Sequence, residues 1–108
     1  AALDTFNRRK LLIACLLMRR PKILLMDEPA SGLINTEIDE LDLLLRKIAD
    51  ELGIAILLIE HRLELVSAIA NKVTVLDLGE IIATDNSDNI FESQAVQEAY
   101  FGIDGNKT

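Results

Sequence analysis

Two adjacent carboxylates follow a short apolar run in the first third of the chain. Residues 23–26 are all apolar, Asp27 and Glu28 follow them, and Pro29 ends the run. A short continuous apolar run beside a proline is typical of a strand that is buried on both faces. Ligands gather at the carboxyl ends of strands in open α/β folds. The run therefore predicts a cation site and a general base at a sheet edge, with a strand that ends in a solvated acidic turn as the alternative.

A second apolar run carries the only histidine of the chain. Residues 54–59 are apolar and lead into Glu60 and His61. Neighbouring parallel strands bring their carboxyl ends together, so we expect Asp27, Glu28 and His61 to face one small volume. A histidine at a strand end, taken alone, is more often a helix cap or a satisfied hydrogen-bond partner. The acidic pair upstream favours the functional interpretation.

The elements that must position these residues alternate between strand and helix. The patterns predict helices at 7–19, 36–52 and 62–70, strands at 23–27, 54–59 and 73–76, an antiparallel return at 81–84, and short helical pieces near 87–92 and 94–100. Asn35 or Thr36 is expected to cap the long helix and Gly53 to end it. This order implies parallel βαβ units and an α/β fold with a small antiparallel edge. An all-α bundle competes, but the β-branched residues at 73–75 weigh against it.

Composition sets further limits. The chain has 108 residues, enough for one domain, half of them apolar, with a net charge of −7. The acidic balance argues against general binding to nucleic acid or anionic membrane. No apolar run approaches the roughly 20 residues that span a bilayer. The basic residues at 8–10 and 19–20 are expected to form a solvated helix face, and Cys15 is expected to be a buried thiol. The first residue is Ala, as in a piece of a longer protein.

Several separated motifs occur in an order that resembles the ATP-binding subunit of ATP-binding cassette (ABC) transporters. They are residues 23–29, 30–33 and 57–61, and the supporting stretches 51–54, 75–79 and 98–102 look closest to the branched-chain amino acid uptake type. The resemblance covers residues 8–102 and the C-terminal half of a cassette. It implies a P-loop NTPase-like (RecA-like) parallel sheet with flanking helices and an antiparallel edge hairpin. Residues 1–108 would be the C-terminal portion of a single ATP-binding domain.

The resemblance also assigns roles. It implies that Asp27 orients the magnesium, that Glu28 is the general base for the attacking water, and that His61 contacts the γ-phosphate, so that all three bind the cofactor. Ser31, Gly32 and Leu33 resemble the loop through which two such subunits touch. ATP and Mg²⁺ are the implied cofactors of the complete cassette. The implied partners are a second cassette subunit and a membrane-spanning permease, on the cytoplasmic face of the cell membrane, with no nucleic acid and no direct membrane insertion.

Three departures from the family pattern limit what is carried over. The phosphate loop Gly-x-x-x-x-Gly-Lys-Ser/Thr is absent from the sequence, so we expect the chain alone to bind nucleotide weakly and to be inactive. Residues 3–7 read Leu-Asp-Thr-Phe-Asn where the family signature Leu-Ser-Gly-Gly-Gln is expected, and they receive no signature role. Ile34 and Arg62 stand where the family usually or often has Asp.

Three functions follow as hypotheses. The first is a fragment or degenerate copy of an ATP-hydrolysing subunit that powers an ABC transporter, with branched-chain amino acid import as the transport. The second is a non-catalytic interaction or regulatory module that keeps the scaffold without ATP turnover. The third is a metal-dependent hydrolase that uses Asp27, Glu28 and His61, although these form a thin ligand set for zinc.

Overall fold

The computed structural model describes residues 4–101. Leu3 of the altered signature and Gly102 of the last supporting stretch lie outside the described residues. The chain divides into two compact units, Ala1–Leu65 and Val66–Thr108.

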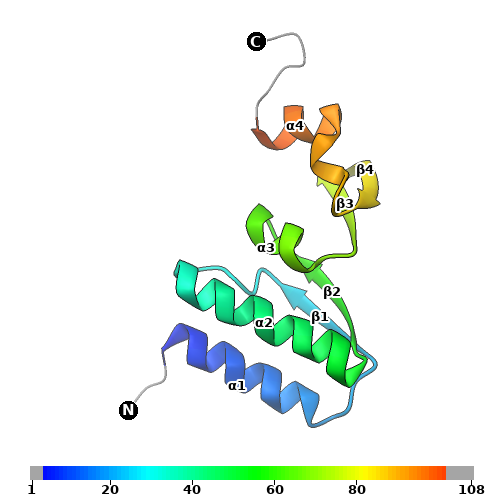
Figure 1. Cartoon of the computed structure of the whole chain (residues 1–108). Coiled ribbons are helices and arrows are strands. Elements are labelled where there is room, and N and C mark those ends of the chain that lie inside the picture. The colour runs from blue at the N-terminus through cyan, green and yellow to red at the C-terminus, as the bar shows by residue number, and fades with distance from the viewer. Residues whose placement is uncertain (1–3, 102–108) are drawn as a thin grey trace. The chain divides into compact units, whose positions relative to one another are not determined.

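The first unit contains one parallel βαβ unit that follows a helix. Its elements are α1 (Thr5–Leu17), β1 (Ile23–Asp27), α2 (Asn35–Leu52) and β2 (Ala55–Ile59). The strands β1 and β2 pair in parallel from Ile23 opposite Ala55 to Asp27 opposite Ile59. The connecting helix α2 runs back in the opposite direction to both strands (Figure 1). This arrangement confirms the predicted parallel pairing and places the carboxyl ends of both strands at the same edge.

The second unit is built around a hairpin. Helix α3 (Leu63–Ile69) spans the boundary between the units, and β3 (Lys72–Asp77), β4 (Glu80–Asn86), η1 (Ile90–Glu92) and α4 (Gln94–Phe101) follow. The strands β3 and β4 pair antiparallel, which confirms the predicted return, and they form a sheet separate from β1 and β2. The turn residues Leu78 and Gly79 have φ values of 50° and 82°, as a type I′ hairpin turn requires. The core of this unit consists of Val75, Ile90 and Val96.

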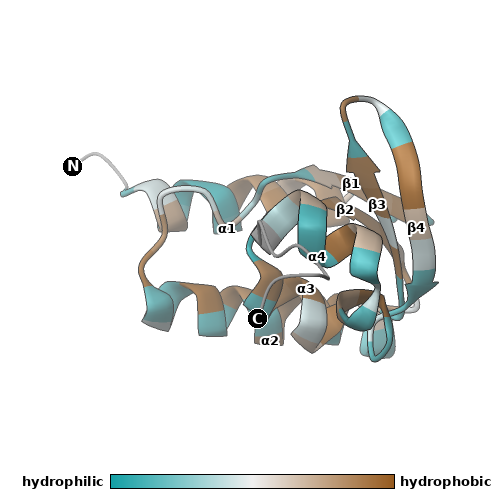
Figure 2. Ribbon diagram, turned by 90° about the horizontal axis from the view of Figure 1, so that it is seen from above, coloured by the Kyte–Doolittle hydropathy of each residue, from teal (hydrophilic) through white to brown (hydrophobic). Residues whose placement is uncertain are grey.

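The prediction that the first strand is buried on both faces is wrong for this chain. Leu24 is 4% exposed, whereas Leu25 on the other face of β1 is 69% exposed. In β2, Leu57 and Ile59 lie on that same open face and are 58% and 60% exposed. The physical reason is that the core-facing rows of both strands are covered, while none of residues 4–65 covers the opposite row. Hydrophobic and hydrophilic residues alternate along α2 (Figure 2), whose buried row is Leu41, Leu45 and Ile48.

Two local predictions are also corrected. Helix α2 begins after Ile34, which is its N-cap, and neither Asn35 nor Thr36 caps it. Because an isoleucine side chain accepts no hydrogen bond, the only capping contact here is from Ile34 N to Glu37 Oε1, at 3.1 Å. Cys15 is exposed, since it lies one turn beyond Leu11 and Leu12, which are also exposed on α1. Gly53 ends α2 in the left-handed conformation, φ 66°, as predicted. Within residues 4–101 no helix is long and apolar enough to cross a membrane.

Candidate functional site

The acidic pair lies at the carboxyl end of β1. Asp27 is the last residue of the strand, and Glu28 extends the pairing by one step because its N–H donates to the Ile59 carbonyl at 2.7 Å. Glu28 then takes a left-handed backbone conformation, φ 48°, which turns the chain out of the sheet. The two carboxylates are therefore presented at the sheet edge by a rigid strand end and a tight turn.

Glu28 and His61 are brought together, as the parallel strand order predicts. The Nδ1 atom of His61 lies 2.7 Å from Oε1 of Glu28. The side chains remain 63% and 47% exposed, so both are accessible from solvent. Nδ1 is occupied by Glu28, whereas Nε2 forms no hydrogen bond or ion pair with the described residues and is available to a ligand. The arrangement places a carboxylate and an imidazole within one hydrogen bond of each other.

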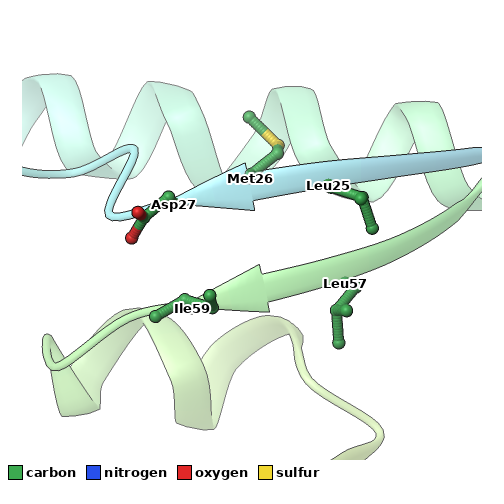
Figure 3. Close-up of a pocket in the computed structure, with 5 residues that line it drawn as sticks. All are labelled: Leu25, Met26, Asp27, Leu57 and Ile59. Atoms are coloured by element: carbon green, nitrogen blue, oxygen red, sulfur yellow. The ribbon is translucent and has the colours of Figure 1, made fainter.

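Asp27 lies at the same edge but is not part of that hydrogen bond. Its side chain forms no hydrogen bond or ion pair with the rest of the described chain. Together with Leu25, Met26, Leu57 and Ile59 it lines a shallow open pocket, shown in Figure 3. The carboxylate is the only charged group of that lining, and its oxygens lie at the end of the strand.

A third carboxylate, that of Glu60, directly follows the carboxyl end of β2. Its side chain is 0% exposed. Oε2 accepts a hydrogen bond from Ala30 N at 3.2 Å, while Oε1 accepts from His61 N at 3.0 Å and from Arg62 N at 3.2 Å. Sequence reasoning treated Glu60 only as the residue that ends the second strand. An acidic residue next to the single histidine, at the end of an apolar run, was the signal that could have found it.

The loop after Glu28 is held from its other side by Arg9 of α1. Nη1 of Arg9 donates to the carbonyl of Pro29 at 2.9 Å and also to that of Ser31. The expectation that the basic cluster is only a solvated face is therefore wrong for Arg9. Its partners lie 20 and 22 residues away in the sequence, and no local pattern indicates them.

The expected dimer-contact loop divides into an exposed part and an anchored part. Ser31 and Gly32 are exposed, whereas Ala30 and Leu33 are 0% and 4% exposed. A Cβ at Gly32 would meet no atom within 4 Å, so the glycine is required by its φ of 77° and not by lack of space. Only Ser31 and Gly32 of the three predicted residues present their surface to solvent.

The segment in place of the family signature is organised as a capped helix start. Asp4 is the N-cap of α1, and its Oδ1 accepts a hydrogen bond from Asn7 N at 2.8 Å. A second bond joins Asn7 Nδ2 to Oδ2 of Asp4 at 3.2 Å. The side chain of Phe6 is 5% exposed. A helix N-terminus binds anions through its free N–H groups, and here a carboxylate of the chain itself already occupies that place.

The donor set limits which metal chemistry the edge can support. Among residues 4–101 no group of three His, Cys, Asp or Glu side chains is arranged to hold a metal ion. Magnesium is a different case, because it is usually held by one or two carboxylates together with waters and substrate phosphates. The unpaired Asp27 carboxylate fits that requirement.

The fold and the strand-end site define the class of protein. The structure is similar to solved ATP-binding cassettes, which have the P-loop NTPase fold. The ADP conformation of MJ1267, an ATP-binding cassette of an ABC transporter, matches with a TM-score of 0.81 and 28% identity, over 94% of this chain and 41% of that one. A putative metal-chelate type ABC transporter matches with a TM-score of 0.83 and 27% identity, over 92% of this chain and 40% of that one. The chain is thus an α/β protein with part of an ABC cassette fold.

The sequence comparisons are more specific. BraF of Pseudomonas aeruginosa, a high-affinity branched-chain amino acid transport ATP-binding protein, is 39% identical over 96 residues, 89% of this chain and 38% of BraF. LivG of Escherichia coli, named for the same transport, is 36% identical over the same shares. No model of a protein family matches the chain. The chain is homologous to the ATP-binding proteins of ABC transporters, including those of branched-chain amino acid transport, and spans about two-fifths of their length.

Proposed function

We propose that residues 1–108 are the C-terminal portion of one ATP-binding domain, and that the complete domain hydrolyses ATP to power an ABC transporter. The observation that carries the proposal is the hydrogen bond between His61 and Glu28 at the ends of two parallel strands. The similarity to BraF and LivG supports import of branched-chain amino acids as the transport.

The open face of the β1–β2 sheet supports the view that further chain completes this domain. Ile23, Leu25, Leu57 and Ile59 are each more than half exposed on it. A contiguous apolar surface of this kind is normally an interface. The chain spans only 38% of BraF, so in a complete domain the remaining chain would cover this face.

The strand-end residues fit distinct roles in phosphoryl transfer. Glu28 acts as general base on the attacking water, and its bond to His61 fixes the direction of its carboxylate. Because Nδ1–H donates to the Glu28 carboxylate, His61 would donate to the γ-phosphate through Nε2 when both ring nitrogens carry a proton. Asp27 would hold Mg²⁺, directly or through water, and the ion would supply positive charge to the phosphate oxygens. Phosphoryl transfer needs mainly positioning and charge stabilisation, and strand ends provide the positioning.

The loop between β1 and α2 supports an assignment to the contact between two cassettes. Ser31 and Gly32 are its exposed residues, and the buried Leu33 anchors it. The further partner would be a membrane-spanning permease, so that the domain works at the cytoplasmic face of the membrane as a peripheral subunit. The cassette cbiO1 of Clostridium perfringens, which is 30% identical, is described as part of the transporter complex cbiONQ.

A second function is favoured by one observation. Asp4 caps α1 at the place where the family signature would grip a phosphate. A non-catalytic interaction or regulatory module that retains the scaffold is consistent with this cap.

Nucleotide affinity separates the two functions. The measurement compares this chain with a version extended at its N-terminus by its own upstream coding sequence, using ATP and Mg²⁺ in a calorimeter. We expect binding by the extended version and weak or no binding by the 108 residues. An upstream region without a phosphate loop, together with no binding by the extended version, would support the non-catalytic module instead.

A further inference from the structure

Glu60 stands apart from the other carboxylates of the site because its side chain is screened from solvent, although the residue as a whole is partly exposed. Its side chain is 0% exposed, against 47% for Glu28. A buried carboxylate is strongly destabilising unless hydrogen bonds or opposite charges satisfy it. The partners of Glu60 therefore show what this side chain is for.

Those partners are backbone N–H groups and not cations. No Lys or Arg of the described chain forms an ion pair with Glu60, and the imidazole nitrogen Nδ1 of His61 lies 3.9 Å from Oε1. That nitrogen is closer to Glu28, at 2.7 Å. Glu60 is thus held by amide dipoles and is screened from solvent, so it is placed to orient groups and not to exchange protons with a substrate.

The hydrogen bonds of Glu60 divide between two loops. Oε2 accepts from Ala30, in the loop after β1, and Oε1 accepts from His61 and Arg62, in the loop after β2. Ala30 adjoins Ser31 and Gly32, the exposed residues of the expected cassette contact. One side chain therefore joins the histidine loop to the contact loop, across 30 residues of sequence.

This bridge requires a carboxylate. An ionised Glu offers two acceptor oxygens, whereas Gln offers one acceptor and one NH₂ donor. In Glu60→Gln the NH₂ group would face either the N–H of Ala30 or those of His61 and Arg62. A donor facing a donor leaves a buried polar group unsatisfied, so an isosteric change removes one half of the bridge.

We propose that Glu60 is a positioning residue that sets His61 and the Ala30–Leu33 loop relative to each other, so that the γ-phosphate contact and the cassette contact are arranged together. The inference rests on the proposed function for the meaning of those two contacts, but the bridge itself can be tested without ATP turnover. The structure assigns to Glu60 no contact with substrate or metal.

The first arm of the test measures amide hydrogen exchange on this chain, resolved to single residues by mass spectrometry at low protein concentration. The variants are Glu60→Gln, Glu60→Ala and, as a matched control, Glu64→Gln, which changes an exposed Glu in the next helix. Losing a hydrogen bond to a charged acceptor predicts exchange faster by about ten- to a hundredfold. In Glu60→Gln we expect this at Ala30 or at the His61–Arg62 pair, with α2 unchanged. In Glu60→Ala the amides of Ala30, His61 and Arg62 should all exchange faster. In Glu64→Gln the exchange of these three amides should not change.

The second arm measures ATP turnover by the N-terminally extended version. We expect Glu60→Gln to lower kcat by about tenfold or more with little change in KM, because displaced groups act mainly in the transition state. Unchanged exchange at all three amides in Glu60→Gln would overturn the bridge. Faster exchange with kcat equal to that of the unaltered protein would overturn the positioning role. No turnover by the unaltered extended version would refute the proposed function alone, and the exchange arm would still decide whether the bridge exists.

Discussion

Neighbouring leucines on β1 provide a direct test of the open sheet face. Leu24 and Leu25 are the same residue type on the same strand, but they are 4% and 69% exposed. Truncation of a buried leucine to alanine removes its transfer free energy and leaves a cavity, so Leu24→Ala should destabilise this chain by about 2–5 kcal/mol. Leu25 has only about a third of its surface to lose, and full burial stabilises by roughly 1.5–3 kcal/mol, so Leu25→Ala should cost less than about 1 kcal/mol.

The assay is equilibrium urea unfolding followed by far-UV circular dichroism at low protein concentration. The same two substitutions are then made in the N-terminally extended version. If additional chain covers the open face, the cost of Leu25→Ala should rise there to about 2–5 kcal/mol, while that of Leu24→Ala changes little. Equal costs for the two substitutions in the 108 residues would refute the exposure of this face. A cost for Leu25→Ala that stays below about 1 kcal/mol in the extended version would refute its burial by further chain.

Three further predictions concern local contacts. Ile34→Asp places an acceptor side chain at the N-cap position of α2, where isoleucine makes no capping hydrogen bond. It should stabilise the chain by about 1 kcal/mol in the same unfolding assay, and no gain would contradict the assigned helix start. Arg9→Ala removes the two hydrogen bonds to loop carbonyls and should lower the free energy of unfolding by about 1–3 kcal/mol. The control Arg8→Ala, at an exposed position, should change it by no more than about 0.5 kcal/mol. Equal effects of the two substitutions would contradict the Arg9 contacts. Leu78→Asn places Asn-Gly in the hairpin turn and should raise Tm. Gly79→Ala should lower Tm, because the φ of Gly79 is positive. The reverse order of the two Tm values would contradict the turn type.

The sequence predicted the βαβ unit because each apolar run was short and bounded by turn residues. The carboxyl-end rule for parallel strands then placed Glu28 beside His61, and the structure shows that hydrogen bond. The predicted strand at 73–76 and its antiparallel return at 81–84 correspond to β3 and β4. These features depend on local patterns and on one general rule of sheet topology.

The errors share a different physical origin. The apolar residues of β1 do not say what covers each face, so Leu25 was expected to be buried and is exposed. Cys15 on α1 was likewise expected to be buried and is exposed. Ile34 occupies the N-cap position of α2 although capping propensity favours the polar residues after it. Glu60 bonds across 30 residues of sequence, and such contacts exist only once the chain has folded.

The central claim is that Glu28 is the general base of an ATP-hydrolysing site. Its most direct test is Glu28→Gln in the N-terminally extended version, with ATP binding measured by calorimetry and hydrolysis by phosphate release. Glu51→Gln, an exposed position near the end of α2, is the matched control. Since a positioned general base contributes about 10²–10⁴-fold, we predict a fall in hydrolysis of that order with ATP affinity unchanged. Turnover by Glu28→Gln equal to that of Glu51→Gln would contradict the assignment.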